Sequence, residues 1–235
     1  MTHLIKIASF LVISLFLFSC CSENNMRNPQ NATPKNFKYL ALGDSYTIGH
    51  SVCETCRFPT QLKDSIVNYL PSNDTFQVKI IAVTGWTTSD LKAAVAADET
   101  GNNYDLVTLL IGVNNQYQNK PFSLYQQEFP ELVTTAIQRA KGDKNNVIVV
   151  SIPDYAYTPY GQGSTTISQG VLQYNEFAKN YCLANDITFV NITDITQLGL
   201  QQPELVASDG LHPSSLAYTK FVERILPHAR AKIND

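Results

Sequence analysis

Five short apolar stretches recur along the chain, and most of them end at a glycine, a proline or a threonine. Within each stretch Val, Ile and Leu follow one another with little polar interruption, which is typical of strands covered on both faces of a sheet. Turn-forming residues at the ends limit each stretch to strand length. The pattern therefore predicts strands at residues 37–42, 77–83, 106–111, 147–152 and 187–192.

The segments between these stretches carry apolar residues at helical spacing. One begins with Thr, Thr, Ser and Asp, which can cap a helix N-terminus, and another stops at Pro71. Pro130 and Pro227 fall inside two of the segments and are expected to kink or divide those helices. The spacing predicts helices at residues 60–70, 88–97, 123–139, 166–184 and 214–232.

Strands that alternate with helices indicate an α/β fold, a three-layer α/β/α sandwich around a parallel sheet. The common doubly wound, flavodoxin-like order for five strands is 2-1-3-4-5, which we expect here. Residues 37–235 contain no long linker and are therefore predicted to form one domain. In this order ligands bind beyond the carboxyl ends of the first three strands, around the switch point.

The N-terminal segment is predicted to be an export signal rather than part of the fold. Lys6 precedes a run of twelve apolar or small residues, too short to span a bilayer, for which about 20 are needed. The sequence Leu-Phe-Ser-Cys at residues 17–20 resembles a bacterial lipobox, which implies a signal peptide at 1–19 and lipidation of Cys20. An ordinary secretory signal and an uncleaved anchor are the alternatives.

Residues 20–36 are mostly polar and are expected to be a flexible tether. With a lipidated Cys20, the domain would be an exported lipoprotein held at the bacterial cell envelope, facing the periplasm or the cell surface.

Composition excludes several classes of protein. The 235 residues carry 17 Lys and Arg against 20 Asp and Glu, a formal charge of −3, which argues against nucleic-acid binding. The apolar fraction of 44% excludes a disordered chain, and five cysteines are too few for a disulfide scaffold. No residue cluster has metal-ligand spacing and no glycine-rich phosphate loop occurs, so we expect no metal and no cofactor. Nothing in the sequence calls for an obligate protein partner.

Polar residues follow each of the first three predicted strands. These are Gly43-Asp44-Ser45, Thr84-Gly85-Trp86 and Gly112-Val113-Asn114-Asn115. Because the carboxyl ends of parallel strands meet at one edge of the sheet, a hydroxyl, a glycine amide and a carboxamide should converge there.

Together with Asp209-Gly-Leu-His212, these blocks resemble the SGNH (GDSL) hydrolase superfamily, in which they occur in the same order. The resemblance covers nearly all of the predicted domain. The name GDSL stands for Gly-Asp-Ser-Leu, and Tyr46 takes the place of the leucine. Asn115 takes the place of an aspartate that is usual in the family. Asn114, beside it, is retained.

The resemblance implies the chemistry of a serine hydrolase. Ser45 would be the nucleophile, His212 its base, and Asp209 the residue that orients His212. The oxyanion would be held by the Ser45 amide, the Gly85 amide and the Asn114 side chain. His50, five residues after Ser45, is the rival base.

The remaining cysteines have structural interpretations. Cys53 and Cys56 close a short loop after the nucleophile, where an exported protein favours a disulfide, with free thiols as the alternative. Cys182 lies in an apolar helical segment and is expected in the core.

The predicted function is cleavage of a carboxylic ester through an acyl-enzyme on Ser45. Short-chain esters, lysophospholipids and acetylated carbohydrates are all within the range of the resemblance. The aromatic residues Tyr46, Trp86, Tyr117 and Tyr155 fall near the crevice. They support the alternative hypothesis, a lipid-anchored protein that binds a glycan there without turnover.

Overall fold

The computed structural model describes residues 33–233 of the chain. The predicted signal segment 1–19, Cys20 and most of the tether 20–36 lie outside these residues. Within the described part, no helix is long and apolar enough to cross a membrane.

A sheet of five parallel strands in the order β2-β1-β3-β4-β5 forms the middle layer, which confirms the predicted class and strand order. β3 and β4 are buried along their whole length, as their apolar sequences require. β2 lies at the edge of the sheet and is only partly buried. The strands are β1 Asn36–Gly43, β2 Thr75–Ala82, β3 Leu106–Leu110, β4 Val147–Val150 and β5 Thr188–Val190.

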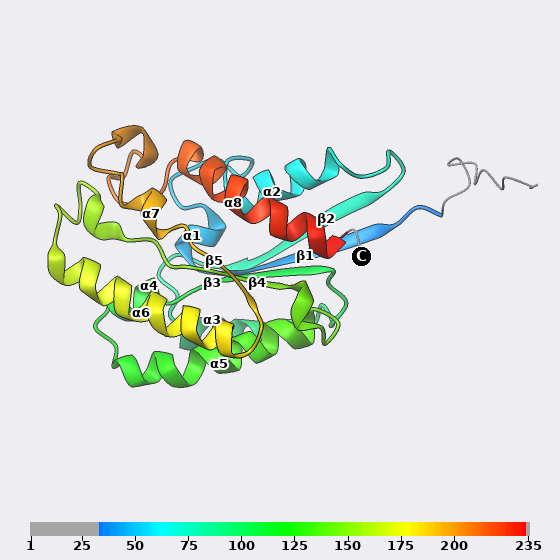
Figure 1. Cartoon of the computed structure of the whole chain (residues 1–235), viewed down its shortest axis with the longest axis horizontal. Helices are drawn as coiled ribbons and strands as arrows, with labels where there is room; N and C mark the ends of the chain where they lie inside the picture. The colour runs from blue at the N-terminus through cyan, green and yellow to red at the C-terminus, as the bar shows by residue number, and fades with distance from the viewer. Residues whose placement is uncertain (1–32, 234–235) are drawn as a thin grey trace, which may run out of the picture. The chain divides into compact units, whose positions relative to one another are not determined.

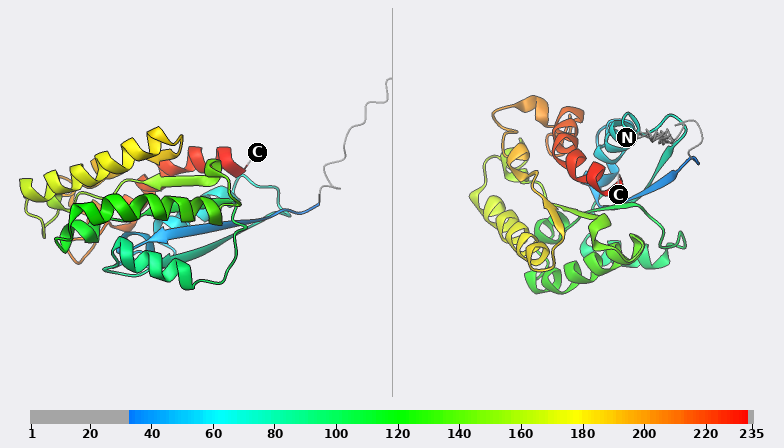
Figure 2. Two further views of the ribbon diagram at one scale, coloured as in Figure 1. Left: turned by 90° about the horizontal axis from the view of Figure 1, so that it is seen from below. Right: turned by 45° about the vertical axis from the view of Figure 1, so that its right-hand side comes forward.

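The helices cover both faces of the sheet (Figure 1). α2 and α8 pack together on one face, and α3, α5 and α6 lie side by side on the other (Figure 2). Because strand-to-strand crossovers are right-handed, the chain changes face when its direction along the sheet reverses after β2. These helices are α2 Phe58–Val67, α3 Thr88–Ala97, α5 Phe122–Arg139, α6 Thr165–Ala184 and α8 Ser215–Ile233.

Short helical turns, which periodicity does not predict, connect the main elements. α1 and α4 follow β1 and β3 directly and begin at the edge where a ligand is expected. The short elements are α1 Ser45–Ile48, α4 Val113–Tyr117 and α7 Thr193–Thr196, with 3₁₀ turns at Lys144–Asn146, Tyr155–Tyr157 and Pro203–Leu205.

Neither Pro130 nor Pro227 divides its helix, contrary to one of the two expected outcomes. A proline inside a helix costs about 3 kcal/mol, because a hydrogen bond is lost and the ring crowds the preceding turn. Buried residues on both sides of each proline offset this cost. In α5 these are Phe129 and Leu132, and in α8 they are Ile225 and Ala229.

The centre of the sheet is expected to dominate stability. Leu109 of β3 has no exposed surface, so Leu109→Ala should lower the free energy of unfolding by about 2–5 kcal/mol. Leu183→Ala is the matched control, because Leu183 in α6 is 63% exposed and its removal should change stability by less than about 0.5 kcal/mol. Urea unfolding measures both. Equal losses in the two variants would contradict this description of the core.

Candidate active site

The loops after β1, β2 and β3 meet at one edge of the sheet, as the strand order predicts. A cavity of about 170 Å³ lies there. Four of the predicted site residues line it together, namely Ser45, Gly85, Asn114 and His212. The other lining residues are Tyr46, Thr84, Val113, Tyr117, Tyr155 and Leu211.

Ser45 is the first residue of α1 and is 3% exposed. Asp44 caps this helix, accepting a hydrogen bond from the Tyr46 amide at 3.0 Å. In the described residues no hydrogen bond joins Ser45 Oγ to His212, although both line the cavity. Such contacts are often loose without a substrate and tighten when it binds.

Asp209 and His212 form a close pair in the turn before α8. His212 Nδ1 lies 2.6 Å from Asp209 Oδ2, and Asp209 Oδ1 accepts the amides of Leu211 (2.9 Å) and His212 (3.0 Å). Three-residue spacing in a turn therefore lets one carboxylate hold both its own backbone and the imidazole. No hydrogen bond from another described residue engages the ring nitrogen Nε2, which can therefore act as a base.

The surroundings of this pair favour a charged aspartate and a neutral histidine. Burial alone would raise the pKa of Asp209, but hydrogen bonds from Ser51, from two backbone amides and from His212 bring that pKa well below its usual range. Burial lowers the pKa of His212 below 6.5, against the opposing effect of the Asp209 charge. At neutral pH the imidazole can therefore accept a proton.

Two backbone amides and one carboxamide were predicted to hold an oxyanion. Gly85 has φ +88°, a left-handed conformation that favours glycine, and a Cβ placed there would meet no atom within 4 Å. The Asn114 carboxamide already donates to Trp86 O (3.0 Å) and to Asp44 Oδ2 (3.4 Å). An oxyanion would have to replace one of these bonds, and the one to Asp44 is the longer.

Asn115 does not line the cavity. It is fully buried, where its Oδ1 accepts the Thr88 amide (2.9 Å) and its Nδ2 donates to Thr88 Oγ1 (2.7 Å). Thr88 Oγ1 in turn donates to the buried Glu128 (2.5 Å). Asn115 thus ties α4 to Thr88 at the start of α3. Its side chain is uncharged, and the buried carboxylate of Glu128 accepts a hydrogen bond from the same Thr88.

The loop after α1 contributes a further residue, Ser51, to the surroundings of Asp209. Ser51 Oγ donates to Asp209 Oδ2 at 2.7 Å, across a sequence separation of 158 residues. No sequence signal marks this serine. His50, the rival base, hydrogen-bonds Thr84 Oγ1 at 3.0 Å, and its ring centroid lies 4.7 Å from that of His212. His50 is exposed and does not line the cavity.

Cys53 and Cys56 are joined by a disulfide in the same loop, and Cys182 is a free, buried cysteine of α6.

His50, Asp209 and His212 place potential metal-ligand atoms within 4.8 Å of one another. Both oxygens of Asp209 already accept hydrogen bonds, from Ser51, two backbone amides and His212. The pairing of Asp209 with His212 therefore explains why these atoms lie close together without a metal ion.

Aromatic side chains surround the cavity as expected, with one exception. Tyr46, Tyr117 and Tyr155 line it, whereas Trp86 does not. Tyr117 is 47% exposed, and its hydroxyl lies 3.0 Å from that of Tyr160, which extends the aromatic surface outward.

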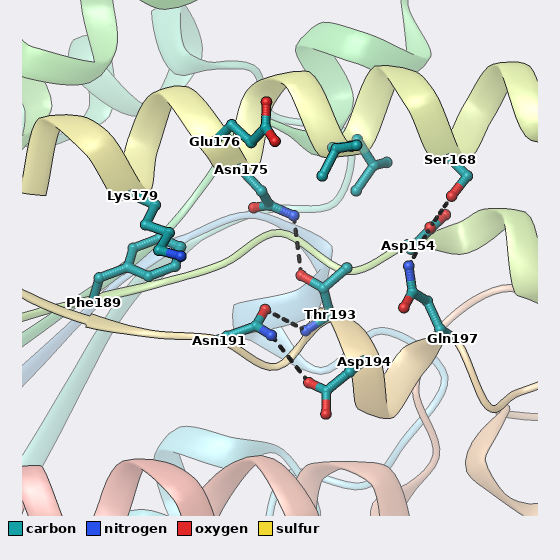
Figure 3. Close-up of a pocket in the computed structure, with 12 residues that line it drawn as sticks. Asp154, Ser168, Asn175, Glu176, Lys179, Phe189, Asn191, Thr193, Asp194 and Gln197 are labelled. Carbon is teal, nitrogen blue, oxygen red and sulfur yellow. Dashed lines mark hydrogen bonds between the residues drawn. The ribbon is translucent and has the colours of Figure 1, made fainter.

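A larger pocket of about 450 Å³ lies between α6 and the segment from β5 to α7 (Figure 3). Its polar side chains bind one another. Asp154 accepts Ser168 Oγ (2.6 Å) and Gln197 Nε2 (3.1 Å), and Asn175 Nδ2 donates to Thr193 Oγ1 (3.0 Å). None of the predicted catalytic residues lines it, so size alone does not identify the site.

The model of the GDSL-like lipase/acylhydrolase family matches residues 41–220, most of the chain. A comparison with curated proteins gives no match.

Several solved structures share the fold. The lipase/acylhydrolase from Enterococcus faecalis is 19% identical, with a TM-score of 0.66, 83% of this chain covered and 96% of that one. TesA is 17% identical, with a TM-score of 0.65 and coverage of 83% and 99%. An acetyl xylan esterase variant from Geobacillus stearothermophilus is 19% identical, with a TM-score of 0.61 and coverage of 83% and 95%.

Asp44 is expected to make stability depend on pH. Complete burial raises its pKa to about 7, against the opposing effect of hydrogen bonds that include those from Tyr46 and Asn114. Because the folded pKa exceeds the unfolded one, the stability associated with protonated Asp44 is fully present below about pH 4 and is lost as the pH rises through about 7.

Asp44→Asn removes this titration. The quantity to compare is the unfolding free energy of the variant minus that of the native protein. This difference should be about 2 kcal/mol larger at pH 8 than at pH 5. Urea unfolding of both proteins at the two pH values measures the difference. If the two proteins differ in unfolding free energy by the same amount at pH 5 and at pH 8, the raised pKa of Asp44 is contradicted.

Proposed function

The chain belongs to the GDSL-like lipase/acylhydrolase family and is an ester-cleaving enzyme, and we propose that Ser45 is its nucleophile and His212 its base. The observation that supports this proposal is the shared cavity. Ser45 and His212 line it from opposite ends of the domain sequence, and Asp209 holds the imidazole from behind.

The proposed reaction proceeds through an acyl-enzyme. Ser45 Oγ attacks the ester carbonyl carbon while His212 Nε2 takes the hydroxyl proton. The C–O bond then breaks, and His212 returns the proton to the departing alcohol. Water attacks the acyl-serine by the same route and releases the acid. Asp209 fixes the tautomer of His212 and stabilises the imidazolium that forms in each half-reaction.

The oxyanion of each tetrahedral intermediate would accept hydrogen bonds from the Ser45 and Gly85 amides. Neither amide donates to another described residue, so both remain available. Asn114 adds a third donor when its carboxamide releases Asp44. One such donor typically contributes a factor of about 10²–10³ in kcat.

The substrate is proposed to be an ester with a short acyl group. The cavity that Ser45 and His212 line is about 170 Å³, small beside the pocket of about 450 Å³ next to α6. Acetylated carbohydrates and short-chain esters fit this volume better than a lysophospholipid does. The exposed Tyr117 and Tyr160 offer a flat surface to the alcohol part. A binding protein without turnover is not favoured, because the family is one of hydrolases.

Removal of the proposed nucleophile is the direct test. With p-nitrophenyl acetate as substrate, Ser45→Ala should lower kcat at least about 1,000-fold, because the acyl-enzyme can no longer form. Ser123→Ala serves as the control, since Ser123 is exposed in α5. Equal rates for Ser45→Ala and the native protein would refute the nucleophile, and no turnover of any ester would favour the binding protein.

We further propose that lipidated Cys20 anchors the enzyme at the bacterial cell envelope. In bacterial cells fed a fatty-acid probe, the native protein and Cys21→Ala should both be labelled, whereas Cys20→Ala should not. Cys21→Ala is the matched control because it removes the neighbouring thiol alone. Equal labelling of Cys20→Ala would show that the anchor lies elsewhere or is absent.

A further inference from the structure

We infer that Ser51 is a positioning residue, which holds the Asp209 carboxylate in place and through it orients His212. This inference rests on the proposed function, since it assigns a role to Ser51 in the action of the His212 base. Ser51 does not line the cavity, and its hydroxyl donates to Asp209.

The hydrogen bonds to Asp209 divide into local and distant ones. The amides of Leu211 and His212 and the ring of His212 all lie within three residues of Asp209. Ser51 is the only donor from outside this turn among the described residues, and it comes from the loop that follows the nucleophile helix. The bond from Ser51 therefore ties the turn that carries the base to the segment that carries Ser45.

Both side-chain donors use the same carboxylate oxygen. Asp209 Oδ2 accepts Ser51 Oγ at 2.7 Å and lies 2.6 Å from His212 Nδ1. One oxygen has two lone-pair directions, so the serine occupies one and leaves the other for the imidazole. Without Ser51 only hydrogen bonds from its own turn would hold the carboxylate, and the direction of the His212 ring would be less well defined.

The backbone at Ser51 adopts a conformation that it shares with four other non-glycine residues of the described chain, so the conformation alone does not identify a role. Its φ is +66°, in the left-handed region that non-glycine residues seldom adopt, and Gly49 two residues earlier is also left-handed at +77°. Such strain persists where the surroundings fix it and often accompanies a functional contact. Here the surroundings are α1 on one side, where the His50 amide donates to Ser45 O at 3.0 Å, and the Cys53–Cys56 disulfide on the other.

The ionisable groups that face the Asp209–His212 pair come from several elements. Asp209 and His212 share one turn. The loop after α1 supplies His50, whose ring centroid lies 4.7 Å from that of His212. Tyr46 of α1 lies 5.1 Å from the His212 ring. Asp154 and Tyr155, from the segment after β4, line a small pocket together with His212, and Asp44 and Tyr218 of α8 lie farther away. Ser51 itself does not titrate, so its replacement leaves every one of these charges in place.

Replacement of Ser51 by glycine separates positioning from strain. Glycine adopts φ +66° freely but has no hydroxyl, so Ser51→Gly should keep a Tm near the native one, because relief of the backbone strain offsets the lost hydrogen bond, while kcat falls about tenfold. KM for p-nitrophenyl acetate should stay within about twofold, because Ser51 does not line the cavity. Ser51→Asn should recover most of the activity, since asparagine tolerates this conformation and its carboxamide can donate to Asp209.

Asp186→Gly is the matched control. Asp186 also has positive φ (+53°) and is exposed, and it lies in the turn before β5, at the opposite edge of the sheet from the site. Native kcat in Ser51→Gly would overturn the inference. An equal loss of kcat in Ser51→Asn or in Asp186→Gly would also overturn it, because the effect would then not depend on a donor to Asp209.

A second measurement keeps the inference testable if the native protein turns over no ester, an outcome that would refute the proposed function alone. The NMR titration of the His212 ring reports its coupling to Asp209 without a substrate. A His212 pKa that differs from native in Ser51→Gly and returns in Ser51→Asn supports the inference. An unchanged His212 pKa in Ser51→Gly contradicts it.

Discussion

The geometry of the site depends on a close backbone contact at the end of β1. Gly43 pairs with Ala82 of β2 on one side and with Leu110 of β3 on the other. A Cβ at Gly43 would come within 2.1 Å of Thr47 Oγ1 and 2.4 Å of Leu110 O, so any other residue would push α1 away from the sheet. Because Ser45 is the first residue of α1, this contact fixes the distance from the proposed nucleophile to the loops after β2 and β3.

Two carboxylates beside the cavity have opposite environments. Asp44 is completely buried with few donors, and its pKa rises to about 7. Asp209 has four donors and keeps its charge, because they outweigh the effect of burial on its pKa. Pairs of acidic groups whose pKa values diverge often mark a division of roles in a site. Here the charged one supports a histidine, and the other caps the helix of Ser45.

Most of the fold could be predicted from the sequence, because parallel strands covered on both faces leave a distinct apolar pattern. The predicted strands all occur, although β5 is shorter at Thr188–Val190. Pro130 and Pro227 divide neither helix, which a local rule about proline leaves open because it does not include packing on both sides of the residue. α1 and α4 were missed because they are too short to show a helical period. The blocks around Ser45 and Gly85 were found because chemistry and strand ends coincide there, whereas Asp209 and His212 were found through the order of the blocks in the family that the sequence resembles.

The sequence by itself determined the alternation of strands and helices, the family and the residue types available at the strand ends. Each of these properties is carried by residues close together in the chain or by blocks in a fixed order. Only the tertiary structure decided that Ser51 binds Asp209 across 158 residues and that the Asn114 carboxamide is engaged by Asp44 and Trp86. Such contacts depend on the exact path of two distant loops, and no periodicity, composition or spacing along the chain records that path.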